Sequence, residues 1–441
     1  MECEQKIYYL WIMSAVLVFG SVAVDAVEIR PGVGVAIEHT NNVELSAKDK
    51  ASDNIAVAYV GANITEDEGP LNYDAVLGFN RYNYLQGSFD DSRYFNLAAN
   101  ADWEMIKDRF NWFMSDIFTQ QTIDSFDVNT PDNLQDSNVF TFGANIIFPF
   151  SARNSFTLTP LYNQYYYELQ TTNNKQYSLE GNWNYKMTRR TNIGLSLSTR
   201  NIDYTQTGVL GGTVEDTRFT NLSFIFSGRK PRSSYAISLG STSVKRDGGE
   251  ETSGFSGNID WTTDLTSRSS FNINASTELT DSSTVSLGDN AGLPNSNVPV
   301  TTDVIRNSIF YIVYQREDAS LRTSVRAEYN EVDYSESPLD QEGKILVATL
   351  DYPLTRRLTS GSYINYNNTK RVSTARVDKG YIWGGNLRYN FSRKLLGRFD
   401  LTYRENDSTI DSEKYDEFTA YVSLVYGFGE VYRPSRVATG F

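Results

Sequence analysis

Few residues in this sequence are suited to catalysis. His39 is the only histidine and Cys3 the only cysteine among 441 residues, so a Ser/His/Asp triad could form only around His39. The neighbours of this histidine, "IEHTNN", place it at the outer end of the first expected strand. His and Cys show none of the spacings of metal sites, and "GVLGGT" at 208–213 is typical of a flexible loop. We therefore expect that the protein is not an enzyme and that it has no catalytic residue, no metal and no cofactor.

Adjacent charged residues are the remaining candidates. The acidic pairs at 90–91 and 250–251 could act as glycosidase carboxylates, but in polar loops we expect them to be solvated or bridged by divalent cations to lipopolysaccharide. Basic groups recur about every forty residues, as in "YKMTRRTNIGLSL" at 185–197. The net charge of −14 argues against nucleic acid as a partner.

The elements that carry these residues follow a period of two. In "YSLEGNWNYKM", Tyr177, Leu179 and Trp183 alternate with the polar residues Glu180 and Asn182. The segments "FNLAANADWEM", "YIWGGNLRYNF" and "GRFDLTYRE" repeat the pattern. Successive side chains of a strand point to opposite faces, whereas apolar residues at this spacing would scatter around a helix. These segments therefore predict strands with one apolar and one polar face.

The number and length of these segments favour a membrane barrel. We count about 20, many with ten or more residues, which is the length that a tilted strand needs to cross a bilayer. Short basic connections alternate with longer acidic ones, and only a closed sheet satisfies its backbone in lipid. We predict an all-β fold with a single antiparallel up-and-down transmembrane β-barrel of about 20 strands (18 is the alternative), short basic periplasmic turns and longer acidic extracellular loops.

The two ends of the chain carry targeting signals. The apolar run at 7–26 ends in "VDA" and predicts a cleaved signal peptide, with a retained membrane anchor as the alternative. We divide the chain into a signal peptide at 1–26, a barrel at 27–428 and a C-terminal periplasmic extension at 429–441. Alternation starts near Val33, so we expect no plug domain before the barrel. The expected location is the outer membrane of a Gram-negative bacterium.

Two local stretches resemble known outer-membrane proteins. "EFTAYVSLVYGFG" near the C-terminus resembles the terminal strand that the outer-membrane assembly machinery recognises. The opening "VGVAIEHTNNVELS" at 33–46, followed by hairpins with T-x-R or S-R turns, resembles the β-barrel porin family that is often encoded in bacterial exopolysaccharide gene clusters. This resemblance implies passage of an exopolysaccharide or a related solute across the outer membrane, and it implies no catalytic motif.

The polar face of the strands is the expected contact surface for a solute. The residues that we expect to line the lumen are Glu180, Asn182, Asn184, Asp260, Arg322, Arg326, Arg388, Arg398, Asp400 and Arg404. The expected periplasmic basic turns carry Arg189, Arg190, Arg229, Arg232, Arg356, Arg357 and Arg393. The longest connection, 281–303, is the candidate for a constriction folded into the lumen, and a mobile external loop is the alternative.

Three functions fit these observations. The first is a channel that takes part in exporting an exopolysaccharide or oligosaccharide, since amides and mixed charges suit hydrated sugars. The second is a general diffusion porin for small solutes, and the third is a closed structural or attachment barrel. The expected partners are outer-membrane lipid and lipopolysaccharide, the assembly machinery, and for the first function polysaccharide and periplasmic export proteins. A basic periplasmic mouth would concentrate an anionic polymer; alternatively, the basic turns serve topology alone.

Overall fold

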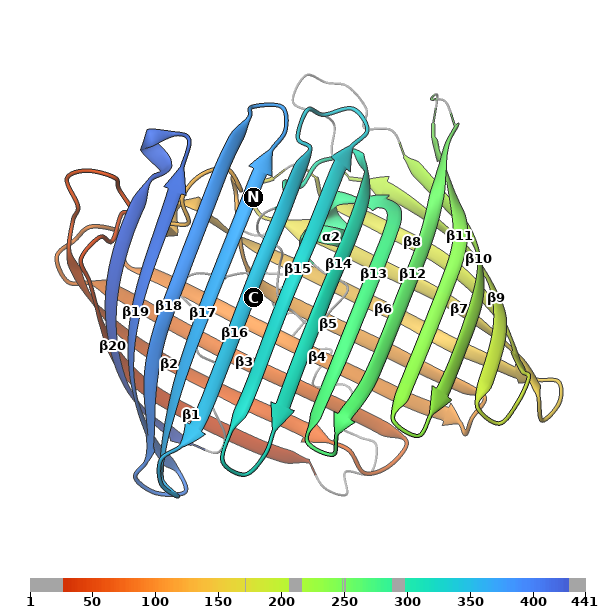
Figure 1. Cartoon of the computed structure of the whole chain (residues 1–441), viewed down its shortest axis with the longest axis horizontal. Coiled ribbons are helices and arrows are strands. Elements are labelled where there is room, and N and C mark those ends of the chain that lie inside the picture. Colours follow the sequence, from red (N-terminus) through yellow and green to blue (C-terminus); the bar gives the residue numbers. More distant parts are fainter. Residues whose placement is uncertain are drawn as a thin grey trace, which may run out of the picture.

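The chain folds into one closed antiparallel barrel of 20 strands (Figure 1). The computed structural model describes residues 27–170, 172–205, 216–247, 249, 251–287 and 298–427. The strands are β1 (Glu28–Thr40), β2 (Asp53–Glu66), β3 (Leu71–Tyr84), β4 (Ser92–Ile106), β5 (Phe110–Thr122), β6 (Leu134–Pro149), β7 (Asn154–Tyr167), β8 (Asn174–Lys186), β9 (Thr191–Tyr204), β10 (Thr217–Lys230), β11 (Ser233–Arg246), β12 (Glu251–Thr266), β13 (Ser269–Asp281), β14 (Val304–Glu317), β15 (Arg322–Tyr334), β16 (Gln341–Pro353), β17 (Leu358–Arg371), β18 (Arg376–Asn390), β19 (Leu395–Ser408) and β20 (Tyr415–Gly427).

Each strand pairs with its neighbours in the sequence, and the last strand closes the sheet on the first. β1 pairs with β2 from Glu28 opposite Thr65 onward, and with β20 from Gly32 opposite Gly427 to Thr40 opposite Thr419. This up-and-down order leaves no free edge, so every strand finds a hydrogen-bonding partner on both sides. The predicted fold class is confirmed, with 20 strands rather than the alternative of 18.

The period of two decides which side chains point outward. On β1, the outward residues Val33, Val35 and Ile37 are 51%, 60% and 48% exposed, while Glu38, the next residue, is buried on the inward face. Similar exposed apolar residues follow on β8 and β18. A soluble protein rarely exposes so large an apolar area, whereas a band of outward apolar side chains is what a transmembrane barrel presents to lipid.

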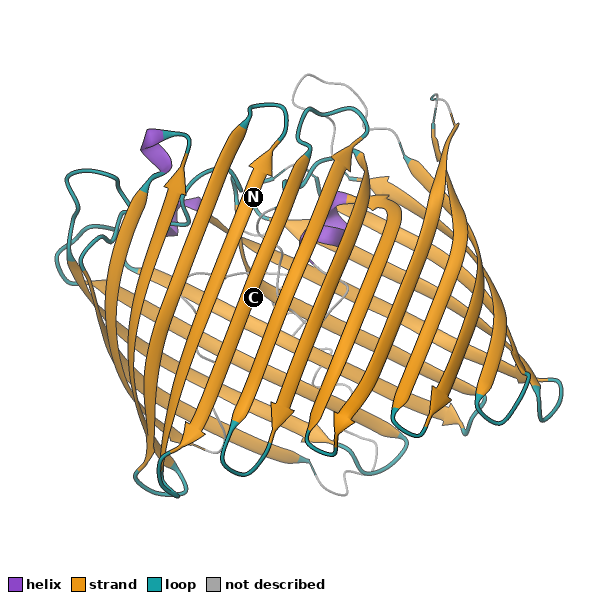
Figure 2. Cartoon of the chain, viewed as in Figure 1, coloured by secondary structure: helices purple, strands orange, loops and turns teal. Residues whose placement is uncertain are grey.

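The two ends of the barrel differ in the length of their connections (Figure 2). We call one the turn end, where the connections are short and where β1 begins and β20 ends. Its turns at 231–232 and 267–268 have only two residues, because the strands extend further than the sequence suggests. We call the other the loop end, where the longer connections lie, among them loop 3 at 123–133 and loop 7 at 282–303.

Several connections at the loop end fold into the barrel. Val43, from the first loop, packs on the inward residues Ile55, Val57, Tyr82 and Tyr84 of β2 and β3. The short helix α2 (Ser282–Leu287) begins loop 7 and lies inside the barrel in Figure 1. Apolar contacts at this end therefore face the lumen, so that the inner surface is not uniformly polar.

The proposed signal peptide at 1–26, the loop at 208–213 and the extension at 429–441 lie outside the described residues, as does Phe428 at the predicted end of the barrel. The described barrel starts with Glu28 and ends with Gly427. Within the described residues, the helices are too short or too polar for a membrane-spanning segment.

Candidate functional site

The inner face of β8 carries three of the expected lumen residues in one row. Glu180 accepts hydrogen bonds from Asn182 Nδ2 at 2.8 Å and from Ser196 Oγ on β9 at 3.0 Å. Asn184 follows on the same face toward the turn end. Leu179, which precedes Glu180 and lies on the outward face, is 44% exposed. Asp260 on β12 has a similar setting, since it accepts a hydrogen bond from Asn272 Nδ2 at 3.1 Å.

The opposite wall carries arginines that pair with carboxylates two residues away on the same strand. Arg398 Nε lies 2.8 Å from Asp400 Oδ2, and the Asp400 side chain is 1% exposed. Arg326 Nε donates to Glu328 Oε2 at 2.9 Å, and its guanidinium lies 4.1 Å from the ring centre of Tyr311. Residues two apart share one face of a strand, so the pattern R-x-[DE] was the sequence signal that could have identified these pairs.

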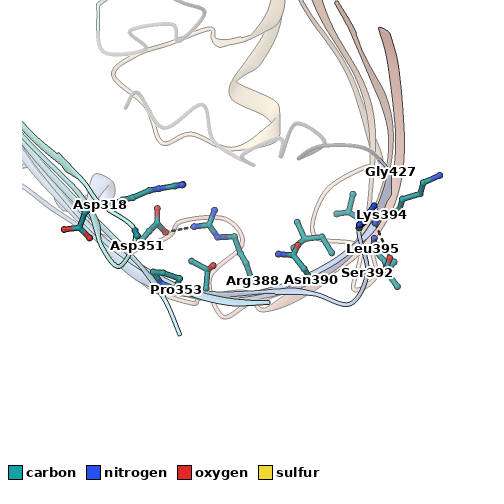
Figure 3. Close-up of a pocket in the computed structure, with 15 residues that line it drawn as sticks. Asp318, Asp351, Pro353, Arg388, Asn390, Ser392, Lys394, Leu395 and Gly427 are labelled. Atoms are coloured by element: carbon teal, nitrogen blue, oxygen red, sulfur yellow. Dashed lines mark hydrogen bonds and ion pairs between the residues drawn. The ribbon is translucent and has the colours of Figure 1, made fainter. Parts of the chain in front are cut away.

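A polar cavity of about 490 Å³ opens inside the turn end (Figure 3). Arg388 reaches across it to Asp351 Oδ1, with Nη2 at 2.5 Å. Arg322 lines both this cavity and a second one of about 570 Å³ beside it, and Arg322 Nε lies 3.1 Å from Glu317 Oε1. The structure thus places Arg322 at the rim of the lumen and Arg388 just inside. The predicted turn residue Arg393 lines the same cavity.

The predicted basic turns all lie at the turn end, and neighbouring turns are joined through their backbones. The N–H of Arg229 donates to the carbonyl of Arg190 at 2.9 Å, and the N–H of Asn390 to that of Arg357 at 2.8 Å. Arg189, Arg232 and Arg356 also have exposed side chains here, and Arg229 lies in the last residues of β10 rather than in the turn itself.

Acidic residues also occur at the turn end. The first turn, at 67–70, carries Asp67 and Glu68. The turn at 318–321 carries Asp318. The basic character therefore belongs to a subset of the turns, mainly those after β8, β10, β16 and β18.

Loop 7 contacts the far wall of the lumen, in line with the constriction expected at 281–303. Asn174 Nδ2 on β8 donates to Ser283 Oγ at 3.0 Å, and Gln121 on β5 donates to Ser286. Arg200 Nη2 on β9 donates to Thr280 Oγ1 at 2.9 Å and lies 3.3 Å from Asp281 Oδ2. The described parts of this segment are therefore held against the inner wall, while 288–297 lie outside the described residues.

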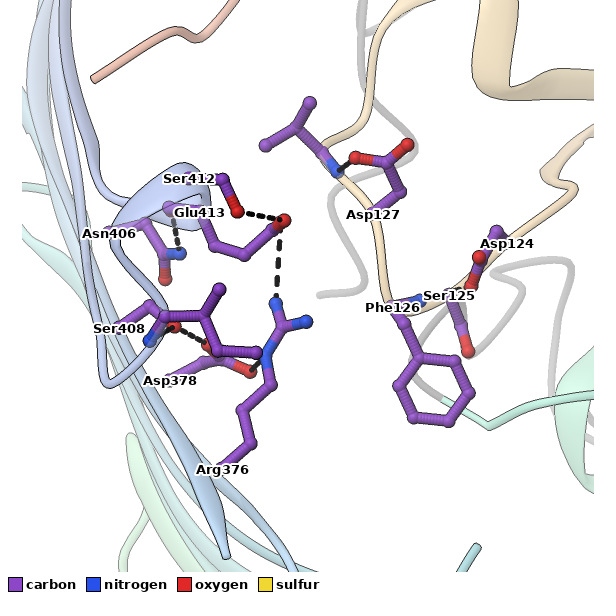
Figure 4. A network of polar contacts seen from close by, with 12 residues as sticks. Asp124, Ser125, Phe126, Asp127, Arg376, Asp378, Asn406, Ser408, Ser412 and Glu413 are labelled. Carbon is purple, nitrogen blue, oxygen red and sulfur yellow. Dashed lines mark hydrogen bonds and ion pairs between the residues drawn. The ribbon is translucent and has the colours of Figure 1, made fainter. Parts of the chain in front are cut away.

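Loop 3 also crosses the lumen, which the sequence analysis missed. Figure 4 shows Ser125 and Phe126 facing the wall formed by β18 and β19. Arg371, at the end of β17, donates from Nη2 to the carbonyl of Ser125 at 3.1 Å, and its guanidinium lies 4.5 Å from the centre of the Phe126 ring. The same guanidinium pairs with Asp378. No local sequence pattern predicts a contact between residues so distant in the sequence.

Ion pairs and hydrogen bonds connect the elements of the wall opposite loop 3. Arg376 Nε lies 2.8 Å from Asp378 Oδ2, and Arg376 Nη2 lies 3.3 Å from Glu413 Oε2. Ser408 Oγ donates to Asp378 Oδ1 at 2.5 Å. Between this wall and loop 3 lies a cavity of about 170 Å³, which Arg404 also lines. Arg404 Nη1 is 3.7 Å from Glu417 Oε2.

The remaining candidates from the sequence stand apart from these cavities. His39 is exposed near the loop end, with Nδ1 3.0 Å from Asn54 Oδ1. Asp91 Oδ2 accepts from Asn83 Nδ2 at 2.5 Å. Glu251 Oε1 accepts from Ser243 Oγ at 2.5 Å, while Glu250 lies outside the described residues. In the described part of the chain, no three His, Cys, Asp or Glu side chains are grouped as a metal ion requires.

Comparison with known proteins identifies the fold and no family. No family profile and no curated protein matches this sequence. The siderophore receptor PirA from Acinetobacter baumannii is similar over 91% of this chain and 80% of its own, with 9% identity and a TM-score of 0.50. A mutant of the ferric enterobactin receptor PfeA from Pseudomonas aeruginosa matches 90% of this chain and 80% of its own, with 11% identity and a TM-score of 0.49. The FrpB iron transporter from Neisseria meningitidis matches 90% of this chain and 81% of its own, with 9% identity and a TM-score of 0.48.

Proposed function

We propose that this barrel is an outer-membrane channel for a hydrated, sugar-class solute, and that its cargo is an exopolysaccharide or oligosaccharide leaving the cell. The observation that carries the proposal is the polar lumen, which keeps cavities of about 490 Å³ at the turn end and about 170 Å³ beside loop 3. A closed attachment barrel has no need for such spaces between its segments.

The chemistry of the lumen supports a sugar-class cargo. Amide side chains such as Asn182 and Asn184 both donate and accept hydrogen bonds, as sugar hydroxyls do. The charged groups on the opposite wall are largely neutralised in pairs, for example Arg398 with Asp400. Such a wall can exchange hydrogen bonds with a passing polyol without trapping it. The resemblance of 33–46 to porins from exopolysaccharide gene clusters supports the same cargo.

The expected orientation follows from the two ends of the barrel. Outer-membrane barrels place short turns in the periplasm and longer loops outside. The turn end would then receive the cargo from periplasmic export proteins, and the loop end, with its acidic loops, would face lipopolysaccharide. Loops 3 and 7 would narrow the path near the outer surface.

Conductance in planar bilayers tests whether the barrel is a channel. We expect the folded protein to carry a steady current. Arg371→Ala should increase this current, because loop 3 loses the hydrogen bond to the Ser125 carbonyl and the guanidinium contact with the Phe126 ring. Arg218→Ala, at an exposed position on β10, is the matched control and should leave the current unchanged. A folded barrel that carries no current would contradict the proposal and favour an attachment role.

Deletion of the gene tests the cargo. Loss of surface polysaccharide, or its retention in the periplasm, is the expected result. Unchanged surface polysaccharide together with altered uptake of small solutes would instead identify a general diffusion porin and rule out the export role.

A further inference from the structure

We propose that the cavity between loop 3 and the wall of β17 to β19 is a binding site for one neutral sugar unit. This proposal rests on the proposed function, because it assigns a site to the sugar-class cargo of the channel. The cavity measures about 170 Å³, which is below the range of about 300–1,000 Å³ that suits drug-sized ligands. Its size therefore limits the occupant to a single small unit.

Unpartnered polar atoms border this cavity. Within the described residues, five of its lining side chains contain a buried nitrogen or oxygen atom without a hydrogen-bond partner, namely Ser125 Oγ, Asn129 Oδ1, Asn365 Oδ1, Arg371 Nε and Arg404 Nε. Asn365 and Arg371 are only 5% and 7% exposed. Buried polar atoms are nearly always satisfied in folded proteins, so their concentration around one cavity points to a ligand that forms hydrogen bonds there.

The unpartnered atoms match the hydrogen-bonding character of a hydroxylated ligand. The amide oxygens of Asn129 and Asn365 only accept, the Nε atoms of Arg371 and Arg404 only donate, and the hydroxyl of Ser125 does both. A sugar hydroxyl can donate to the first kind and accept from the second. A carboxylate ligand could not donate to the amide oxygens, and an ammonium ligand could not accept from the guanidinium groups.

The charges around the cavity favour a neutral occupant. Arg371 and Arg376 both pair with Asp378, and Arg376 also lies 3.3 Å from Glu413. Arg404 has Glu417 at 3.7 Å. An anionic sugar would therefore meet guanidinium groups that are already neutralised, and it would gain little over its hydration in water.

The position of the site suits a cargo that passes one unit at a time. Loop 3 contributes Ser125 and Asn129 from one side, while Asn365 belongs to the inner face of β17 on the other. A sugar held here would bridge the two sides of the narrowed lumen. The site would thus recognise one unit of a chain as it leaves the barrel.

Saturation-transfer NMR on the purified barrel in detergent micelles tests the site. The probes are glucose, galactose and mannose, with glucuronate as the anionic probe and serine as the zwitterionic one. At least one neutral hexose should bind saturably and more tightly than glucuronate or serine. The Kd of that hexose should rise about tenfold in the double variant Ser125→Ala/Asn365→Ala, because each lost hydrogen bond weakens binding severalfold. Arg218→Ala, at an exposed position on β10, should bind like the parent.

The design separates this site from the channel function and from a folding defect. Ser125 Oγ and Asn365 Oδ1 have no hydrogen-bond partner among the described residues, so their removal should leave the heat-dependent gel shift of the folded barrel unchanged. Sugar binding that the double variant weakens would support the site even if the barrel carried no current. Absence of binding by every hexose, an unchanged Kd in the double variant, or preferential binding of glucuronate or serine would overturn it.

Discussion

At the scale of single residues, Asp318 shows how one carboxylate fixes a turn. Its Oδ1 accepts hydrogen bonds from the backbone N–H of Ser320 and of Leu321, both at 2.9 Å, and from the Ser320 hydroxyl at 2.8 Å. Its Oδ2 accepts from Arg316 Nη2 at 2.9 Å. An aspartate that bonds the backbone two residues ahead is a common way to close a turn. Asp318 thus stabilises its turn, and the nearby Arg316 supports it.

These contacts give the turn at 318–321 a predictable dependence on pH. The bonds from Ser320, followed by the one from Arg316, hold the pKa of the Asp318 carboxyl well below its usual range. A lowered pKa stabilises the turn above the usual carboxyl range, and this stabilisation is lost as the pH falls through the folded-state value. We expect Asp318→Asn to speed amide hydrogen exchange at 318–321 at neutral pH, and the difference from the parent to shrink on strong acidification. Equal exchange at neutral pH would contradict this assignment.

Where local alternation decides the face of a strand, the sequence indicates on which side of the wall a single residue lies. Glu180 and Asn182 lie in the lumen because their odd-numbered neighbours face outward. The contact of Arg371 with Ser125 was missed because it joins residues 246 positions apart, and it exists only once the barrel has closed. Nothing near Arg371 in the sequence distinguishes it from other residues at strand ends.

At the scale of elements, the segment around α2 depends on a polar anchor inside the barrel. Asp281, whose side chain is 2% exposed, lies 3.3 Å from Arg200 and also accepts from Thr284 Oγ1 at 2.7 Å. The Arg200 guanidinium lies 4.7 Å from the centre of the Phe219 ring. Leu279 and Val304 pack with Ile202 in an apolar cluster beside these contacts. The strand ends that flank loop 7 are thus held by both polar and apolar contacts.

A double-mutant cycle can measure this anchor. Arg200→Met leaves a buried carboxylate without its cation, which typically costs about 3–5 kcal/mol. Adding Asp281→Asn removes that carboxylate charge, so the double variant should be more stable than Arg200→Met alone. The measurement is the midpoint of urea unfolding of the barrel in micelles, with Arg218→Met as the exposed control. A double variant that is less stable than both single variants would show that the two side chains do not act as a pair.

The elements differ in how far the sequence predicted them. The strands follow from alternation over 13 to 16 residues, a signal strong enough to predict about 20 of them, with 18 as the alternative. The six residues of α2 carry no helical periodicity, and their polar serines resemble any loop. Their burial results from the inner wall of β5, β8 and β9, which lie far away in the sequence. The sequence thus predicted the barrel wall, whereas most of what narrows the barrel became visible only in the structure.

At the scale of the whole molecule, the basic turns form an incomplete ring around one mouth. They lie at the turn end, while acidic connections dominate the loop end. Separate charges in solvent have weak effects, but a ring of like charge around a low-dielectric opening attracts ions of opposite sign. The first turn, with Asp67 and Glu68, interrupts this ring. Any effect on transport must therefore come from many turns together.

Charge reversal at the turn end tests this collective effect. Changing Arg189 and Arg190 to Glu should shift the reversal potential of the channel in a salt gradient only slightly. Changing all seven predicted arginines, including Arg356, Arg357 and Arg393, should shift the selectivity clearly toward cations, and this shift should fade at high salt because of screening. Matched replacement of loop-end lysines such as Lys414 is the control. Equal shifts from two and from seven substitutions would contradict a collective ring.

The ion pairs within single strands affect how the number of strands in such a barrel can change over evolution. Arg326 with Glu328 and Arg398 with Asp400 each neutralise their charge without help from a neighbouring strand. A duplicated hairpin would bring its own counter-ions, and a deleted one would take them away. Where the charges of a hairpin are paired in this way, the barrel can gain or lose that hairpin over evolution without leaving an orphaned charge on the wall.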